Sequence, residues 1–142
     1  MEGLSKRERV YFSNAKNEAT LSDHRCKIGC VVVDKHRMVS SGHNSNTKCH
    51  RRQAELDRKE FGVESRGPVH AEMDALLPFL ASHTRELTNA SIYVYREMLD
   101  GTRGLARPCT RCMKIIKSLG ISKVYYSTFD GFAKETITEE TV

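Results

Sequence analysis

The amino-acid sequence predicts an α/β fold in which a mixed β-sheet is flanked by helices on both faces. Two observations support this prediction. Strand-like runs alternate with helix-like stretches in the second half of the chain, a pattern typical of parallel strands joined by crossover helices. In the first half, a short polar turn joins two strand-like runs, which indicates an antiparallel pair. The length suits one domain, so we assign residues 1–142 to a single domain.

The first half is predicted to contain a helix and a β-hairpin. Helix-favouring side chains predominate over residues 5–21. The expected buried face of this helix consists of Val10, Phe12, Ala15 and Ala19. Residues 26–34 include an uncharged run of β-favouring side chains, and the polar turn 34–37 leads into a second strand over residues 38–41.

The second half is predicted to alternate between helix and strand. His70 is expected to open a largely apolar helix that follows a Gly-Pro pair. A second helix is expected to start at Cys109, where Pro108 opens it, and to end near Gly120. β-Favouring residues predict strands over 91–95 and 123–127. These elements complete the expected mixed sheet.

Two segments lack a clear periodic pattern. Residues 45–67 are rich in charge and have no sustained apolar period, so we expect an insertion or partly helical excursion that walls a pocket. Residues 130–142 follow the last predicted strand, and the sequence leaves their structure open. The connection 96–107 contains Asp-Gly and Gly turn signals and is expected to form one lip of the site.

Composition favours a protein of the cytoplasm without a membrane partner. No apolar run approaches a membrane span, and the charged N-terminal residues lack the apolar core of a signal peptide. Five cysteines with no sign of export indicate reduced thiols. The net charge of +5 is compatible with nucleic acid and with a small phosphorylated substrate. Aromatic residues make up only 7% of the chain, so an extended base-stacking surface is not expected.

Two short motifs together supply the groups of a hydrolytic zinc site. The first is His70-Ala71-Glu72, and the second is Pro108-Cys109-Thr110-Arg111-Cys112. One imidazole and two thiolates leave a position for water on a four-coordinate zinc, whereas structural zinc sites are closed by four protein ligands. The cysteine spacing puts both sulfurs on one face of a first helical turn, where the helix dipole stabilises thiolates. Glu72 is then a free carboxylate placed to move protons.

Other readings of these residues stay open. A closed structural zinc site in a binding module would need a fourth ligand from Cys26, Cys30 or Cys49. The two motif cysteines alone are also compatible with a redox pair, although the context expected near such a motif is missing. A second, loosely spaced zinc site could involve His43, Cys49 and His50.

The paired motifs resemble those of the cytidine and deoxycytidylate deaminase family. The resemblance implies a three-layer α/β/α fold, Zn²⁺ as cofactor and homo-oligomeric assembly. It implies that His70, Cys109 and Cys112 bind zinc and that Glu72 is the proton shuttle. Gly42-His43-Asn44 resembles the stretch that places an asparagine amide against the substrate's sugar. The expected substrate-binding residues are Asn44, Ala71, Arg107 and Tyr126.

The function implied by this resemblance is hydrolytic deamination of a cytosine nucleotide, with deoxycytidylate (dCMP) the expected substrate. Three arginines are candidates for binding its phosphate: Arg103, Arg107 and Arg111. Tyr126 and Phe129 follow the last predicted strand, where family members often wall the base. The alternative is a nucleic-acid-editing deaminase that takes cytosine from single-stranded DNA or RNA, or adenine from transfer RNA, into the same pocket.

Overall fold

A computed structural model describes residues 3–45, 70–82 and 87–138 of the chain. The helices are α1 (Lys6–Ala19), α3 (Ala71–Ser82) and α4 (Thr110–Ser118). The strands are β1 (Lys27–Asp34), β2 (Arg37–His43), β3 (Ala90–Glu97), β4 (Arg103–Gly104), β5 (Lys123–Ser127) and β6 (Phe132–Thr136). The predicted insertion lies outside the described residues, except for Ser45 at its start.

The strands form one mixed sheet, as predicted from the sequence. Their order is β2-β1-β3-β5-β6, and the short strand β4 pairs with β3. Strand β1 is antiparallel to both β2 and β3, whereas β3 and β5 are parallel and are joined through α4. The residues after β5, whose structure the sequence left open, form β6 antiparallel to β5.

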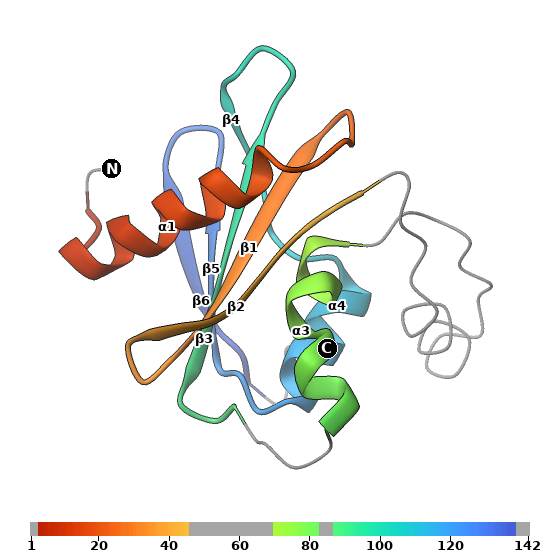
Figure 1. Ribbon diagram of the computed structural model, residues 1–142. Helices are drawn as coiled ribbons and strands as arrows, with labels where there is room; N and C mark the ends of the chain where they lie inside the picture. Colours follow the sequence, from red (N-terminus) through yellow and green to blue (C-terminus); the bar gives the residue numbers. More distant parts are fainter. Residues whose placement is uncertain (1–2, 46–69, 83–86, 139–142) are drawn as a thin grey trace.

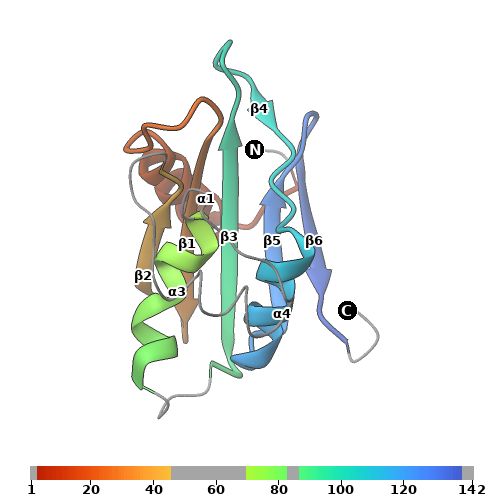
Figure 2. The same ribbon diagram turned by 90° about the vertical axis from the view of Figure 1, so that its right-hand side faces the viewer.

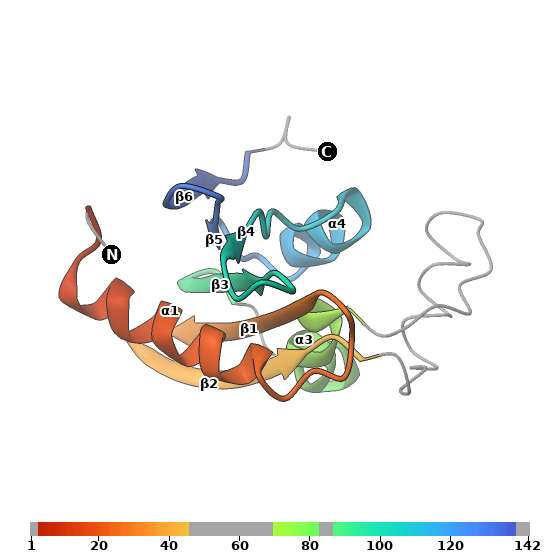
Figure 3. The same ribbon diagram turned by 90° about the horizontal axis from the view of Figure 1, so that it is seen from above.

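Helices cover both faces of the sheet, which confirms the predicted three layers. Helix α1 lies on one face, and α3 and α4 lie side by side on the other (Figures 1 and 3). Figure 2 shows α3 and α4 in front of the sheet, both beginning toward the end of β3 that leads to β4. In the described part of the chain, each helix is too short or too polar to cross a bilayer.

The buried face of α1 differs by one residue from the prediction. Phe12, Ala15 and Ala19 are buried as expected, but Val10 is 50% exposed and Tyr11 takes its place. Residues 11, 15 and 19 are spaced by four and lie on one helical stripe, and residue 10 is rotated out of it. Phe12 packs edge-on against Tyr93, with ring centroids 5.1 Å apart.

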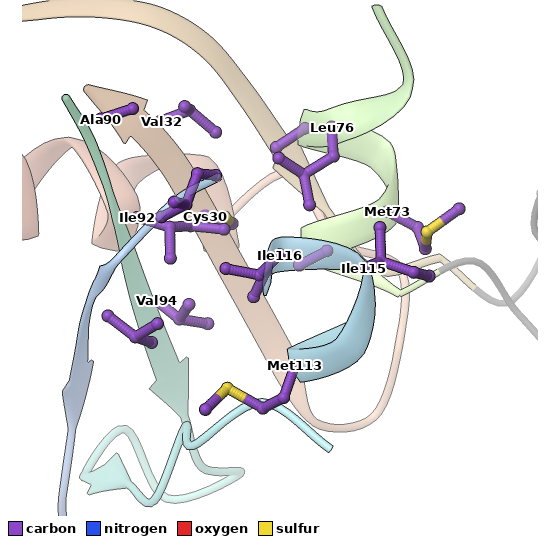
Figure 4. Packing of buried hydrophobic residues seen from close by; sticks show 14 of the residues in the cluster. Cys30, Val32, Met73, Leu76, Ala90, Ile92, Val94, Met113, Ile115 and Ile116 are labelled. Atoms are coloured by element: carbon purple, nitrogen blue, oxygen red, sulfur yellow. The ribbon is translucent and has the colours of Figure 1, made fainter. Parts of the chain in front are cut away.

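The larger hydrophobic core lies between the sheet and the helices α3 and α4. Figure 4 shows apolar side chains of β1 and β3 facing those of the two helices. Fully buried members include Val32, Met73, Leu76, Ile92, Val94, Met113 and Ile116. This packing fixes both helices on one face of the sheet, so that their first turns can contribute to one site.

Gly29 in β1 is a position where α1 approaches too closely for a side chain. A Cβ atom there would collide with the backbone oxygen of Ala15 and the backbone nitrogen of Ala19. We therefore expect Gly29→Ala to lower the free energy of unfolding by about 3 kcal/mol through overpacking. Urea denaturation measures this change.

The control for that substitution is Gly131→Ala. The nearest atom to a Cβ at this position is Thr128 Oγ1 at 3.9 Å, which is ordinary contact. This variant should stay within about 0.5 kcal/mol of the wild type. Equal stability of the two variants would contradict the close α1–β1 packing.

Candidate active site

The three predicted zinc ligands come together from two separate segments of the chain. The Nδ1 atom of His70 lies 3.4 Å from Cys112 Sγ and 3.8 Å from Cys109 Sγ. The ligand atoms of the three residues all lie within 4.8 Å of one another. Within residues 3–45, 70–82 and 87–138, this is the one group of three or more potential metal-binding side chains.

The donor set and its spacing fit a zinc ion. Zinc–sulfur and zinc–nitrogen bonds of about 2.3 and 2.0 Å at tetrahedral angles place a nitrogen and a sulfur about 3.5 Å apart. The two nitrogen–sulfur distances, 3.4 and 3.8 Å, lie on either side of this value. In the described residues, neither Cys26 nor Cys30 joins the group, which removes them as fourth ligands of a closed site. Cys49 and His50 lie outside the described residues.

The starts of α3 and α4 position the ligands. His70 and Cys109 each precede a helix, and their carbonyl oxygens accept hydrogen bonds from the backbone of Asp74 (3.0 Å) and Met113 (2.8 Å). The helices were predicted to start at His70 and Cys109, but each begins one residue later, α3 at Ala71 and α4 at Thr110. Cys112 lies in the first turn of α4, on the same side as Cys109, as its spacing predicted.

Hydrogen bonds among the ligands divide their protons unequally. A hydrogen bond with Cys112 lowers the pKa of the Cys109 thiol to about 3. The same bond, together with burial, raises the pKa of Cys112. A hydrogen bond with Cys109 raises the pKa of the His70 imidazole. Cys109 can therefore bind a metal ion as a thiolate. The protons retained by Cys112 and His70 must leave when the metal binds.

Glu72 is a buried carboxyl next to these ligands. Glu72 is 5% exposed and lies in the first turn of α3. Burial raises the pKa of Glu72, and the charge of His70 opposes that rise. A carboxyl whose pKa is moved toward neutrality can both accept and return a proton, which is what general acid–base catalysis requires.

Two of the three ligands, His70 and Cys109, line a cavity of about 310 Å³. This volume is near the lower end of the range of small-molecule pockets. Its walls come from the α1–β1 loop, the start of β1, the residue after β2, the end of β3, the start of α3 and the segment before α4. The lining residues are His24, Cys26, Ile28, Asn44, His70, Ala71, Glu72, Arg96, Leu105, Ala106, Arg107 and Cys109.

A larger cavity, of about 630 Å³, lies away from these ligands. It is bounded by the start of α1, the β1–β2 turn and the β3 and β5 ends that are remote from the ligands, and its lining includes Tyr93 and Tyr125. None of the three metal ligands, nor Glu72, lines it. We therefore place the chemistry in the smaller cavity, because a reaction site is defined by its reactive groups and not by its size.

Asn44 lines the smaller cavity but also has a role within the protein. Its Oδ1 accepts hydrogen bonds from Ser22 Oγ (2.7 Å) and from the Ile28 backbone (2.9 Å). Its Nδ2 donates to the Cys26 carbonyl at 2.7 Å. The side chain therefore holds the α1–β1 loop as a cavity wall. Contact with a sugar stays a prediction.

Of the other predicted substrate-binding residues, some line the cavity and some do not. Ala71 is buried and lines the cavity. Tyr126 packs in the main core and Phe129 is 68% exposed, and neither lines the cavity. Arg107 lines the cavity, but its Nε and Nη2 donate to the Glu135 carboxylate at 2.6 and 3.1 Å. This pairing raises the pKa of Arg107 and lowers that of Glu135.

The arginines near the cavity are placed differently from what the sequence predicted. Arg103, a predicted phosphate ligand, donates to the Thr128 carbonyl at 3.1 Å and lies over the Phe132 ring, outside the cavity lining. Arg96, which begins the predicted lip 96–107 but was not named as a site residue, lines the cavity together with His24 and Cys26. A signal was available for Arg96, because strand alternation places it on the same face as Ile92 and Val94, where a charge is unusual.

Comparison with known proteins gives the same fold. The dCMP deaminase of the cyanophage S-TIM5 in apo form is 23% identical, with a TM-score of 0.58 over 83% of this chain and 79% of that chain. Its complex with dCMP and dUMP gives 21% identity and a TM-score of 0.59 over 87% and 82%. Cytidine deaminase from Burkholderia pseudomallei is 19% identical, with a TM-score of 0.62 over 94% of this chain and 93% of that chain. No curated protein sequence matches the chain.

A family model supplies the sequence-level match. The cytidine and deoxycytidylate deaminase zinc-binding region matches residues 5–128, which include the three metal ligands and Glu72. That range extends from the N-cap of α1 to just beyond β5. The ligand spacing and the family match agree on the metal. The chain therefore belongs to the cytidine and deoxycytidylate deaminase family, a zinc-binding family, and His70, Cys109 and Cys112 are its candidate zinc ligands.

Proposed function

We propose that this chain is a zinc-dependent hydrolase that converts dCMP and water to dUMP and ammonia. The observation that supports this most strongly is one cavity bounded by His70, Cys109 and the buried carboxyl of Glu72. Zinc in a site with three protein ligands acts as a Lewis acid and lowers the pKa of water. Hydrolysis of the amino group of cytosine needs such a site and a proton carrier.

Glu72 is the proton carrier in this proposal. It takes a proton from the attacking water and delivers it to N3 of cytosine as the oxygen adds to C4. The proton left on the added oxygen then passes through Glu72 to the 4-amino group, which leaves as ammonia while the C4–O double bond of uracil forms. Burial suits Glu72 to this role because a raised pKa brings the two protonation states closer in free energy.

The choice of a mononucleotide rests on the cavity and on the fold. A volume of about 310 Å³ suits a single nucleotide. The structure of the cyanophage S-TIM5 enzyme with dCMP and dUMP has a similar fold, which supports the same substrate class. We also propose that Asn44, Ala71 and Arg107 contribute to substrate binding from the cavity lining, and that Tyr126 contributes from behind it through Arg107 and Glu135. We further propose that residues 1–142 form one domain that assembles as a homo-oligomer in the cytoplasm.

A substrate panel tests the proposed reaction. Ammonia release is measured with dCMP, deoxycytidine, cytosine and cytosine-containing oligonucleotides. We expect the highest kcat/KM with dCMP, because a small cavity with cationic lining favours a compact anion over a polymer. Turnover confined to oligonucleotides, or to adenine in transfer RNA, would instead assign the chain to nucleic-acid editing.

Removal of the proton carrier tests the role of Glu72. Gln has nearly the same shape as Glu but cannot accept and return a proton, so Glu72→Gln should lower kcat by about 10³-fold. Zinc content, measured by elemental analysis, should stay at the wild-type value. Glu97→Gln is the matched control, because Glu97 does not line the cavity, and it should keep wild-type turnover. Wild-type kcat in Glu72→Gln would remove this residue from the mechanism.

Removal of a ligand tests the metal site. Cys109→Ser should lose zinc and show a lower midpoint of thermal unfolding, because metal binding and folding are coupled. Cys26→Ala should retain zinc, because Cys26 is outside the ligand group. Stoichiometric zinc in the Cys109 variant, or its loss in the Cys26 variant, would contradict the assigned ligand set.

A further inference from the structure

The cavity contains a guanidinium group that the reaction itself does not need. Arg96 lies at the end of β3, where it pairs with Ile28 of β1 on one side and Gly104 of β4 on the other. Alternation along β3 directs its side chain to the face that carries α3 and α4, as for Val94. The side chain therefore reaches the cavity just beyond the hydrophobic core.

The backbone at this position is held firmly. The Arg96 backbone N–H donates to Ser127 Oγ at 3.0 Å, and Ser127 Oγ donates to the Gly104 carbonyl at 2.8 Å. Ser127 is fully buried. Strand β3 is thus fixed to β4 and β5 where Arg96 leaves the sheet, and a side chain on such a rigid element is well suited to ligand recognition.

The guanidinium of Arg96 is poorly satisfied within the protein. Its Nη2 donates to Cys26 Sγ at 3.2 Å, and a thiol sulfur is a weak acceptor. Its Nε is buried and has no hydrogen-bond partner in the described part of the chain. A buried donor without a partner is unfavourable, so a ligand that supplies strong oxygen acceptors would be bound with a gain in free energy.

Among the described residues of the lining, Arg96 is the arginine whose charge is not matched by a carboxylate. Arg107, the other arginine of the lining, is neutralised by its two hydrogen bonds to Glu135. Among the described lining residues, Glu72 is the one carboxylate, and it is assigned to proton transfer. The free positive charge therefore comes from a guanidinium fork, which matches the oxygens of a phosphate.

We propose that Arg96 binds the phosphate of the mononucleotide substrate and so sets the preference of the site for a nucleotide over a nucleoside. This inference rests on the proposed deamination of a cytosine monomer and names the residue that selects its form. Phosphate oxygens would replace the weak sulfur contact of Cys26 and give the guanidinium charged acceptors. Arg107, which the sequence suggested for this role, already has such acceptors from Glu135.

The test compares substrates with and without phosphate. Steady-state kinetics are measured with dCMP and deoxycytidine for the wild type, Arg96→Gln, Arg96→Lys, Arg107→Gln and Arg37→Gln. Equilibrium binding of dUMP and deoxyuridine to the zinc-loaded proteins gives a second readout that does not depend on turnover. Arg37 is exposed at the start of β2, at the sheet end away from the site, and its variant is the matched control.

We expect Arg96→Gln to lower kcat/KM for dCMP and the affinity for dUMP by about 30- to 100-fold, the effect of losing a charged hydrogen-bonding pair. Values for deoxycytidine and deoxyuridine should change by less than about threefold. Arg96→Lys keeps the charge without the fork, so its loss should be smaller, about tenfold. Arg37→Gln should match the wild type with all four compounds.

Two results would overturn the role of Arg96. One is an equal loss with phosphorylated and unphosphorylated compounds, which indicates a structural role. The other is loss of phosphate selectivity in Arg107→Gln but not in Arg96→Gln. Failure of the wild type to deaminate any cytosine monomer would instead reject the proposed function. In that case the dUMP and deoxyuridine affinities still decide whether Arg96 recognises phosphate.

Discussion

The active site depends on the fixed approach of α3 to the sheet, because this helix carries His70 and Glu72 toward the two cysteines. Gly42 permits that approach, since a Cβ atom there would lie 2.7 Å from the Ala71 carbonyl oxygen. Side chains then fix the helix: Ser40 Oγ donates to the Ala75 carbonyl at 2.6 Å, and Asp74 Oδ2 accepts from the His43 backbone at 3.1 Å. Strand β2 thereby sets the distance from the imidazole to the thiols on α4.

The sequence predicted the parts of the site that are encoded locally. His70 and Glu72 are two residues apart, and Cys109 and Cys112 are three apart, so each pair lies within one short segment at the start of a helix. The mixed sheet was also predictable, because strand-like and helix-like runs are distinct over most of the described chain. In α1, Tyr11 is buried where the sequence predicted Val10. The Tyr11 hydroxyl donates a hydrogen bond to the His36 carbonyl at 2.9 Å while the ring stays buried.

The remaining cavity wall was predicted only in part, because several of its residues are distant in sequence from the motifs. His24 and Cys26 enter it through the α1–β1 loop, which is held by hydrogen bonds to Asn44. Arg107 was one of three arginines predicted as phosphate ligands, but its charge is matched by Glu135, a residue in the tail that the sequence left unassigned. Only the antiparallel pairing of β6 with β5 brings that carboxylate into reach.

The segment between β3 and α4 links the metal ligands to substrate selection. It leaves β3 after Glu97, returns as β4 beside it and supplies Leu105 and Ala106 to the cavity before reaching Cys109. The same pairing extends the sheet by one more strand next to Arg96. Because both the zinc ligand and the guanidinium are anchored to this one segment, a phosphate held by Arg96 would keep a fixed relation to the metal. Rigid spacing of this kind orients the base for reaction.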